Sequence, residues 1–189
     1  HWYAPSLASA REAGVADWAT QDVVALLQTG TSPRGSTMGP MAEVVLRSTQ
    51  FLSDTDLHAM AVYLKALPQQ TPAAPPVKAP ESGQLSAGAT LYKEHCAQCH
   101  GEAGEGARGA YPALAGNRAV TLETPANLVQ TVLHGGFAPA TAGNPRPYGM
   151  PPFQQTLDGP QIAAVLTYSR HAWGNAASPV SALEVMQNQ

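Results

Sequence analysis

Apolar residues recur at helical spacing in three stretches of the second half of the chain, and each stretch begins at a residue suited to start a helix. The predicted helices begin at Ser86, at Thr124-Pro125 and at Asp158, and the last runs to Trp173 before Gly174-Asn175 end it. The apolar positions that carry the pattern are Leu91, Tyr92, Leu128, Val129, Val132, Leu133, Ile162, Val165 and Leu166. This pattern predicts an all-α fold.

The first part of the chain repeats the pattern of the last two of these helices. Residues 22–30 match residues 127–135, and residues 52–63 match residues 157–168, both at an offset of 105 (127 − 22 and 157 − 52). Ser53 with Asp56 adds a helix-capping signal at the start of the second match. One offset shared by two helical patterns indicates a duplication.

A proline-rich stretch, residues 68–83, separates the two parts. It has five prolines in sixteen residues. Such a composition is typical of an extended linker, which at about 3.1 Å per residue would span roughly 40–50 Å. The predicted organisation is a first segment over residues 1–67, the linker, and a second segment over residues 84–189. The first segment repeats only the back half of the second.

Composition and charge narrow the class of protein. Of the 189 residues, 44% are hydrophobic and only 12% are charged, and the net charge is −3. A globular, loop-rich chain without the basic patches of a nucleic-acid-binding protein is expected. Since no apolar run reaches 18 residues, the sequence predicts no membrane span, and membrane attachment would come only through partners.

The two cysteines, Cys96 and Cys99, allow three interpretations: a redox disulfide, half of a metal site, or a haem attachment site. The βαβ pattern that accompanies a thioredoxin-like motif is not visible, and no second ligand pair supports zinc. His100 completes a Cys-X-X-Cys-His motif. Its thiols can reach the two vinyl groups of one haem while the histidine binds the iron. The motif therefore predicts one covalently bound haem c.

The sixth iron ligand is predicted to be Met150, fifty residues after His100 in a stretch of glycine and proline. A residue before proline avoids helical conformation, so an irregular loop is expected there. Methionine ligation raises the reduction potential relative to two histidines. His134, at the end of a predicted helix, is the alternative sixth ligand.

The chain resembles the cytochrome c subunits of periplasmic membrane-bound dehydrogenases for alcohols and gluconate, and related subunits of molybdenum-containing aldehyde and N-heterocycle dehydrogenases. This family is similar to a string of three class I cytochrome c domains. The resemblance implies that residues 1–67 are a partial cytochrome c-like domain, the back of the middle one, and that residues 84–189 are the complete last one. The stretches that carry the resemblance are residues 3–7, 39–45, 48–52, 63–68, 96–101, 111–117, 150–153 and 173–175.

The resemblance also implies roles for single residues. Met41 would be the axial ligand of a haem in the first segment, with Met38 as the alternative, since Met38-Gly39-Pro40-Met41 stands where the second segment has Gly149-Met150-Pro151. The carbonyl of Pro112 would accept a hydrogen bond from His100. Tyr111 and Arg118 would contact the haem edge or its propionates.

The predicted function is electron transfer rather than catalysis. A dehydrogenase catalytic subunit would deliver electrons to the haem, and a quinone or an oxidase would accept them. The expected location is the bacterial periplasm, in association with the membrane through partners. One alternative is a catalytic cytochrome that oxidises a small sulfur compound, although no third cysteine offers a reactive group. A free monohaem shuttle is the other, and the linker and the half-domain argue against it.

The first segment lacks a Cys-X-X-Cys-His motif of its own. Two explanations remain. The chain could be the back of a longer multihaem protein, in which Met41 ligates a second haem attached upstream, and this is the expectation that we favour. Alternatively, the first segment lost its haem, and Met38 and Met41 are packing residues.

Overall fold

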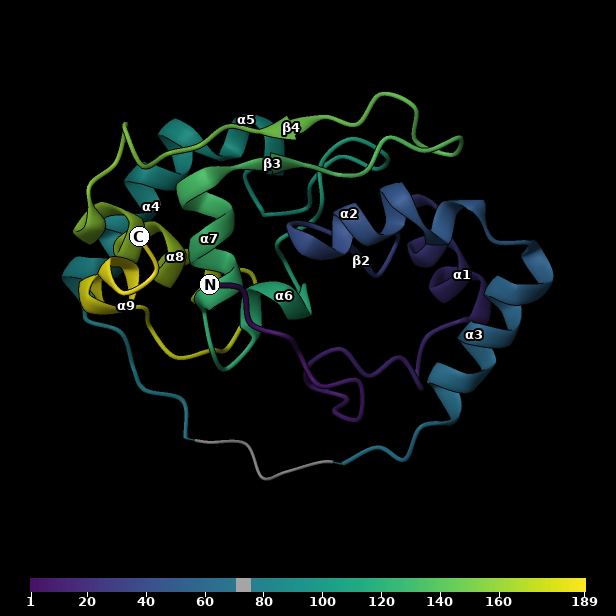
Figure 1. Ribbon diagram of the computed structural model, residues 1–189. Coiled ribbons are helices and arrows are strands. Elements are labelled where there is room, and N and C mark those ends of the chain that lie inside the picture. Colours follow the sequence, from purple (N-terminus) through teal and green to yellow (C-terminus); the bar gives the residue numbers. More distant parts are fainter. Residues whose placement is uncertain (71–75) are drawn as a thin grey trace. The chain divides into compact units, whose positions relative to one another are not determined.

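The computed structural model describes residues 1–70 and 76–189, and its helices and short strands are shown in Figure 1. The chain forms two compact units. Unit 1 consists of His1–Tyr3, Pro75–Gly135 and Met150–Gln189, and unit 2 of Ala4–Ala74 and Gly136–Gly149. Residues 71–75 of the predicted linker lie outside the described residues.

The helices of unit 1 pack around α8, and the close approach of α4 is its tightest feature. A Cβ atom at Gly88 of α4 would lie 2.2 Å from the carbonyl oxygen of Ala164 in α8, so only a glycine fits this crossing. The helices of this unit are α4 (Ser82–His95), α5 (Ala97–His100), α6 (Arg118–Thr121), α7 (Ala126–His134), α8 (Gly159–His171) and α9 (Ala182–Met186).

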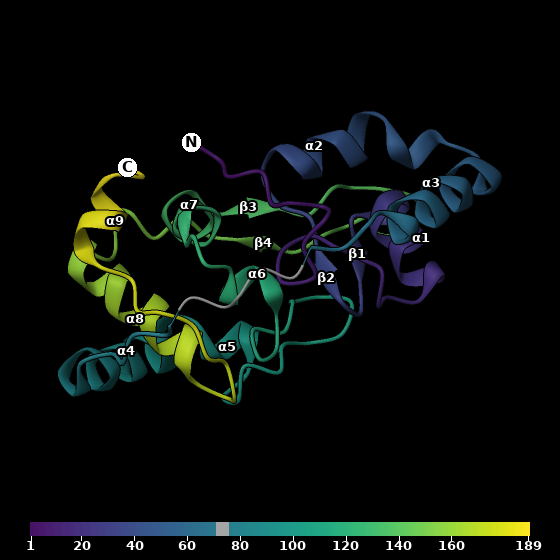
Figure 2. The ribbon, with the colours of Figure 1, turned by 90° about the horizontal axis from the view of Figure 1, so that it is seen from below.

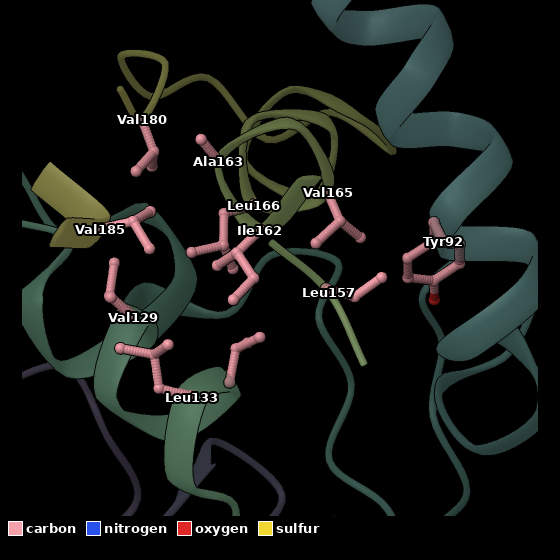
Figure 3. Packing of buried hydrophobic residues seen from close by; sticks show 11 residues of the cluster. Tyr92, Val129, Leu133, Leu157, Ile162, Ala163, Val165, Leu166, Val180 and Val185 are labelled. Carbon is pink, nitrogen blue, oxygen red and sulfur yellow. The ribbon is translucent and has the colours of Figure 1, made fainter. Parts of the chain in front are cut away.

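The core of unit 1 lies between α7, α8 and α9. Figure 3 shows Val129 and Leu133 of α7 pointing toward Ile162 of α8, with Val185 of α9 beside them. All four side chains are almost completely buried. Burial of one such side chain contributes about 1.5–3 kcal/mol, so this cluster is a main source of the unit's stability.

Unit 2 is built on the pair α1 and α3. Its core consists of Val15, Trp18, Val23, Leu27, Leu57 and Ala61. Strands β1 and β2 pair antiparallel, with Thr31 opposite Ser36, and β3 is paired with β4. The elements are α1 (Thr20–Thr29), β1 (Thr31–Ser32), β2 (Gly35–Ser36), α2 (Pro40–Arg47), the 3₁₀ helix η1 (Thr49–Phe51), α3 (Asp54–Ala66) and β3 (Gly136–Phe137). Strand β4 (Gly149–Met150) begins in unit 2, and its second residue, Met150, belongs to unit 1. Figure 2 shows the same elements from below.

The mostly helical fold agrees with the all-α prediction, and the predicted repeat recurs in the helix limits. Helix α3 (54–66) and helix α8 (159–171) differ by 105 residues at both ends, and α1 and α7 end 105 residues apart. The capping residues also correspond. Ser53 accepts a hydrogen bond from the amide of Asp56, and Asp158 accepts one from the amide of Gln161.

Three predicted helix limits are wrong. Helix α4 begins at Ser82, inside the predicted linker, and Ser86 lies within it, donating its hydroxyl to the carbonyl of Gly83. Packing on α8 outweighs the low helix propensity of Ser82-Gly83. Pro125, not Thr124, is the N-cap of α7. Helix α8 ends at His171, not at Trp173, because its C-cap Ala172 has an extended backbone, and Trp173 then follows with φ of 57°.

None of the helices in the described part of the chain has the length and hydropathy needed to cross a bilayer.

Candidate functional site

Cys96 lies at the junction of two helices, as the C-cap of α4 and the N-cap of α5. Its carbonyl accepts hydrogen bonds from the amides of Cys99 (3.1 Å) and His100 (2.9 Å), which places the Cys-X-X-Cys-His motif on one helical turn. Both thiols are free and half-buried. Burial, and then the neighbouring Cys99, raise the pKa of the Cys96 thiol to about 11. At Cys96 the raised pKa disfavours the thiolate, which is the reactive form of a redox cysteine.

The ring orientation of His100 is fixed by one hydrogen bond. Its Nδ1 lies 2.9 Å from the carbonyl oxygen of Pro112, which is the partner implied by the resemblance. Because a carbonyl can only accept, Nδ1 carries the proton, and the lone pair of a neutral ring is on Nε2. Burial lowers the pKa of His100, against the opposing effect of the bond to Pro112. The neutral form with a free Nε2 is the form that binds metal.

A glycine brings Pro112 close to this histidine. Gly106 has φ of 66°, and a Cβ atom there would lie 2.5 Å from the carbonyl oxygen of Tyr111. Its amide donates to the carbonyl of His100 at 2.7 Å. Any larger residue would push the Pro112 segment away. The sequence interpretation missed Gly106, although the glycine-rich run after His100 was a visible signal.

The aromatic side chain of Tyr92 links the motif to the core. Its hydroxyl donates to the carbonyl of Gly101 at 2.7 Å, directly after His100. Its ring lies against Tyr168 and Trp173, with ring centroids 5.5 Å and 4.8 Å away. Burial is the main cause that raises the pKa of Tyr92. The hydroxyl is therefore a permanent donor to this turn.

Two buried polar side chains, Asn175 just after α8 and Arg170 near its end, hold neighbouring segments of unit 1 by hydrogen bonds to backbone groups. Neither role was predicted from the sequence. Asn175 accepts a hydrogen bond from the amide of Gly116 (2.9 Å) and donates to the carbonyls of Leu114 (3.0 Å) and Ser169 (2.8 Å). These bonds connect the loop after Pro112 to α8.

Arg170 has only 1% of its surface exposed. Its guanidinium donates to the carbonyls of Val120 (2.7 Å), Leu122 (2.8 Å) and Ser178 (2.9 Å). A charge on an otherwise apolar helix face was the signal that could have identified it.

Met150 lies in β4, half-buried against the core cluster that Cys96 also contacts. The chain after it is fixed by the amide of Phe153, which donates to the carbonyl of Val132 in α7 at 3.0 Å. His134, the alternative ligand, is exposed at the end of α7. The packing thus groups Met150, and not His134, with the cysteine motif.

The remaining predicted residues lie as follows. Tyr111 is half-buried in the loop beside Pro112, and Arg118 is the first residue of α6. Met41 is 41% exposed in α2 of unit 2, and Met38 lies in the same unit. The structure does not bring Met41 into unit 1. Within residues 1–70 and 76–189, no group of three or more His, Cys, Asp or Glu residues could hold a metal ion.

These residues fit a c-type haem. They supply two free thiols on one turn, an imidazole with a free Nε2 and a thioether backed by the core. Several apolar side chains that pack against the same core cluster as Cys96 and Met150 are only partly buried, which leaves apolar surface for a macrocycle. They are Leu91, Leu114, Leu128, Phe153, Tyr168 and Trp173.

Comparison with known proteins agrees with this fit. Residues 85–173 match the family described as Cytochrome c. The chain is 36% identical, over 99% of its length, to the cytochrome c subunit of the quinone alcohol dehydrogenase of Gluconobacter oxydans. It is 31% identical over 98% of its length to the fructose dehydrogenase cytochrome subunit of Gluconobacter japonicus. It is 33% identical over 93% to the gluconate 2-dehydrogenase cytochrome c subunit of Pantoea cypripedii. The chain spans 41%, 43% and 42% of these relatives.

Proposed function

We propose that the chain transfers electrons within a dehydrogenase complex through a covalently bound haem c. Residues 85–173 match the cytochrome c family, and the chain is similar to dehydrogenase cytochrome subunits. The observation that carries the proposal is the helical turn of Cys96, Cys99 and His100 together with the hydrogen bond from His100 to Pro112. Together they present two thiols and one correctly protonated imidazole to a single group.

We assign the two thioether bonds to Cys96 and Cys99, the fifth iron ligand to Nε2 of His100 and the sixth to the sulfur of Met150. When bound, the haem supplies a one-electron iron couple. His100 keeps its Nδ1 proton and donates it to the carbonyl of Pro112, so its ring stays oriented and its basicity is raised. Met150 would hold the remaining iron ligand position, which suits a carrier and not a catalyst. Tyr111 and Arg118 would contact the edge of the group or its propionates.

The proposed electron donor is a dehydrogenase catalytic subunit, as the names of the relatives suggest. The proposed acceptor is a quinone or an oxidase, and the proposed location is the bacterial periplasm. Residues 1–67 are proposed to be a partial cytochrome c-like domain in which Met41, or Met38, ligates a second haem. The matching limits and caps of α3 and α8 support this part of the proposal.

The test is the haem content and the ligation state of the purified native protein. Replacing Cys96 and Cys99 by alanine is expected to remove one haem from those that remain attached after denaturation, the haem bound at this motif. Met150→Ala is expected to lower the reduction potential and to let carbon monoxide bind the reduced iron. Met41→Ala is the matched control and should leave the haem attached at Cys96 and Cys99 unchanged.

Two outcomes would count against the proposal. If the unaltered reduced protein binds carbon monoxide without denaturant, the sixth position is open, and the alternative of a catalytic cytochrome is favoured. If Met150→Ala leaves the potential and spectrum unchanged, Met150 is not the ligand.

A further inference from the structure

The segment that leads to Met150 belongs to a different compact unit from Met150 itself. The chain leaves unit 1 after Gly135, contributes residues 136–149 to unit 2, and returns to unit 1 at Met150. We call residues 136–149 the anchor segment. It begins with β3 and ends at Gly149, the first residue of β4, and these two strands pair with each other (Figure 2). Met150 is the second residue of β4.

The anchor segment packs on the C-terminal end of α1. Gly30, the C-cap of α1, has a left-handed backbone, and a Cβ atom there would lie 2.3 Å from the Cγ atom of Pro139. Pro139 is buried. The proline ring therefore rests directly on the backbone of Gly30, where only glycine leaves room for it.

A second contact lies two residues further along the segment. The hydroxyl of Thr141, a side chain only 5% exposed, donates to the carbonyl of Thr29 at 3.5 Å. The last carbonyls of a helix lack partners within the helix, so this bond satisfies one of them. The backbones of Thr141 and Asn144 exchange two hydrogen bonds of 3.1 Å, which makes the tip of the segment a closed turn.

Two glycines let the segment approach this closely. A Cβ atom at Gly143 would lie 2.5 Å from Cγ2 of Thr29, and one at Gly136 would lie 3.1 Å from Cε of Met38. The segment is thus fixed to unit 2 near its start, its middle and its tip. A connection of this length without such contacts would sample many conformations.

We propose that the end of α1 acts as a positioning element for Met150, by holding the anchor segment and, through the β3–β4 pair, the backbone of the sixth ligand. The inference rests on the proposed function, because it concerns Met150 as an iron ligand. The contacts at the end of α1 then affect how tightly the thioether is presented.

The test uses Gly143→Ala in the full haem-loaded chain. The added methyl group meets the stiff, branched side chain of Thr29, so the segment must shift. We expect about tenfold tighter binding of added imidazole to the oxidised iron, as an overpacked contact weakens the Met150 bond. A lower reduction potential and unchanged haem content should accompany it. Gly143→Val is expected to enlarge both changes.

Thr29→Ser removes only the methyl group that the new side chain strikes, and it keeps the hydroxyl that bonds the carbonyl of Ala25. The double variant Gly143→Ala/Thr29→Ser should therefore return imidazole affinity and potential toward the original values. Gly159→Ala is the matched control, because a Cβ atom there meets open space.

The outcomes separate this inference from the proposed function. If Met150→Ala raises imidazole affinity and both Gly143 variants leave it unchanged, the positioning role is wrong and the ligand assignment stands. A Gly143 effect that Thr29→Ser does not reverse also overturns the positioning role. If Met150→Ala itself changes nothing, the ligand assignment fails.

Discussion

Helix α3 of unit 2 and helix α8 of unit 1 have the same length, matching caps and matching positions in the repeat, yet they are buried very differently. In α8, eight residues are buried, while α3 buries only Leu57 and Ala61. Tyr168 lies against Tyr92 and Trp173, whereas Tyr63, 105 residues earlier, is 67% exposed. The difference is the cover that α4 and α9 supply to α8. Burial is thus set by the neighbouring helices and not by the repeated pattern.

The basic residue near the end of each helix also occupies a matching position in the repeat and differs in burial. Lys65 in α3 donates to the carbonyls of Ala16 and Trp18. Arg170, 105 residues later, donates to the carbonyls of Val120 and Leu122. Each side chain therefore binds two backbone carbonyls, two residues apart, in the segment that precedes α1 or α7. Lys65 is half-buried and Arg170 is fully buried, so the same device should differ in strength.

The largest expected effect comes from removing this charge. Arg170→Met should destabilise the protein by about 3–5 kcal/mol, because it leaves buried carbonyls without donors. Lys65→Met should cost about 1 kcal/mol, since water can replace the ammonium group. Urea denaturation of the holoprotein, followed by circular dichroism, measures both. Equal losses would show that burial does not separate the two helices.

A smaller effect is expected from overpacking the two helix faces. Ala164→Leu places a large side chain in the buried face of α8, near the Gly88 crossing, and should cost about 1–3 kcal/mol. Ala59 occupies the matching position of α3 and is exposed, so Ala59→Leu should change stability by less than about 0.5 kcal/mol. The same denaturation curves report both. A destabilising Ala59→Leu would mean that this face of α3 is covered in solution.

The smallest effect, and one predicted to be similar in both units, concerns the helix caps. Asp158→Ala and Ser53→Ala should each cost about 1 kcal/mol, because each removes one acceptor for a helix amide at a solvent-exposed end. Their thermal midpoints, compared with those of Asp158→Asn and Ser53→Thr, isolate the capping bond. A loss at Asp158 several times that at Ser53 would show that its role extends beyond capping.

Sequence patterns predicted what depends on neighbours along the chain and missed what depends on distant contacts. The helices, the caps at Ser53 and Asp158 and the cysteine motif are local features, and apolar spacing or motif spacing reveals them. The roles of Arg170 and Asn175 come from partners 50 and 61 residues away. The start of α4 was misplaced for the same reason, since its packing on α8 is a long-range contact. Gly106 was missed although its contact with Tyr111 is local.

The hydrogen bond from Tyr92 to Gly101 also sets how the cysteine motif responds to fluctuations. The ring of Tyr92 belongs to the core cluster, and its hydroxyl closes the turn after His100. The turn cannot open without disturbing an aromatic group that the core encloses. Its amides should therefore exchange hydrogen with solvent only when the whole unit unfolds, while exposed amides of the anchor segment exchange through local opening. The turn of Cys96, Cys99 and His100 and the loop before Met150 would then be the slow and the fast sides of the proposed haem site.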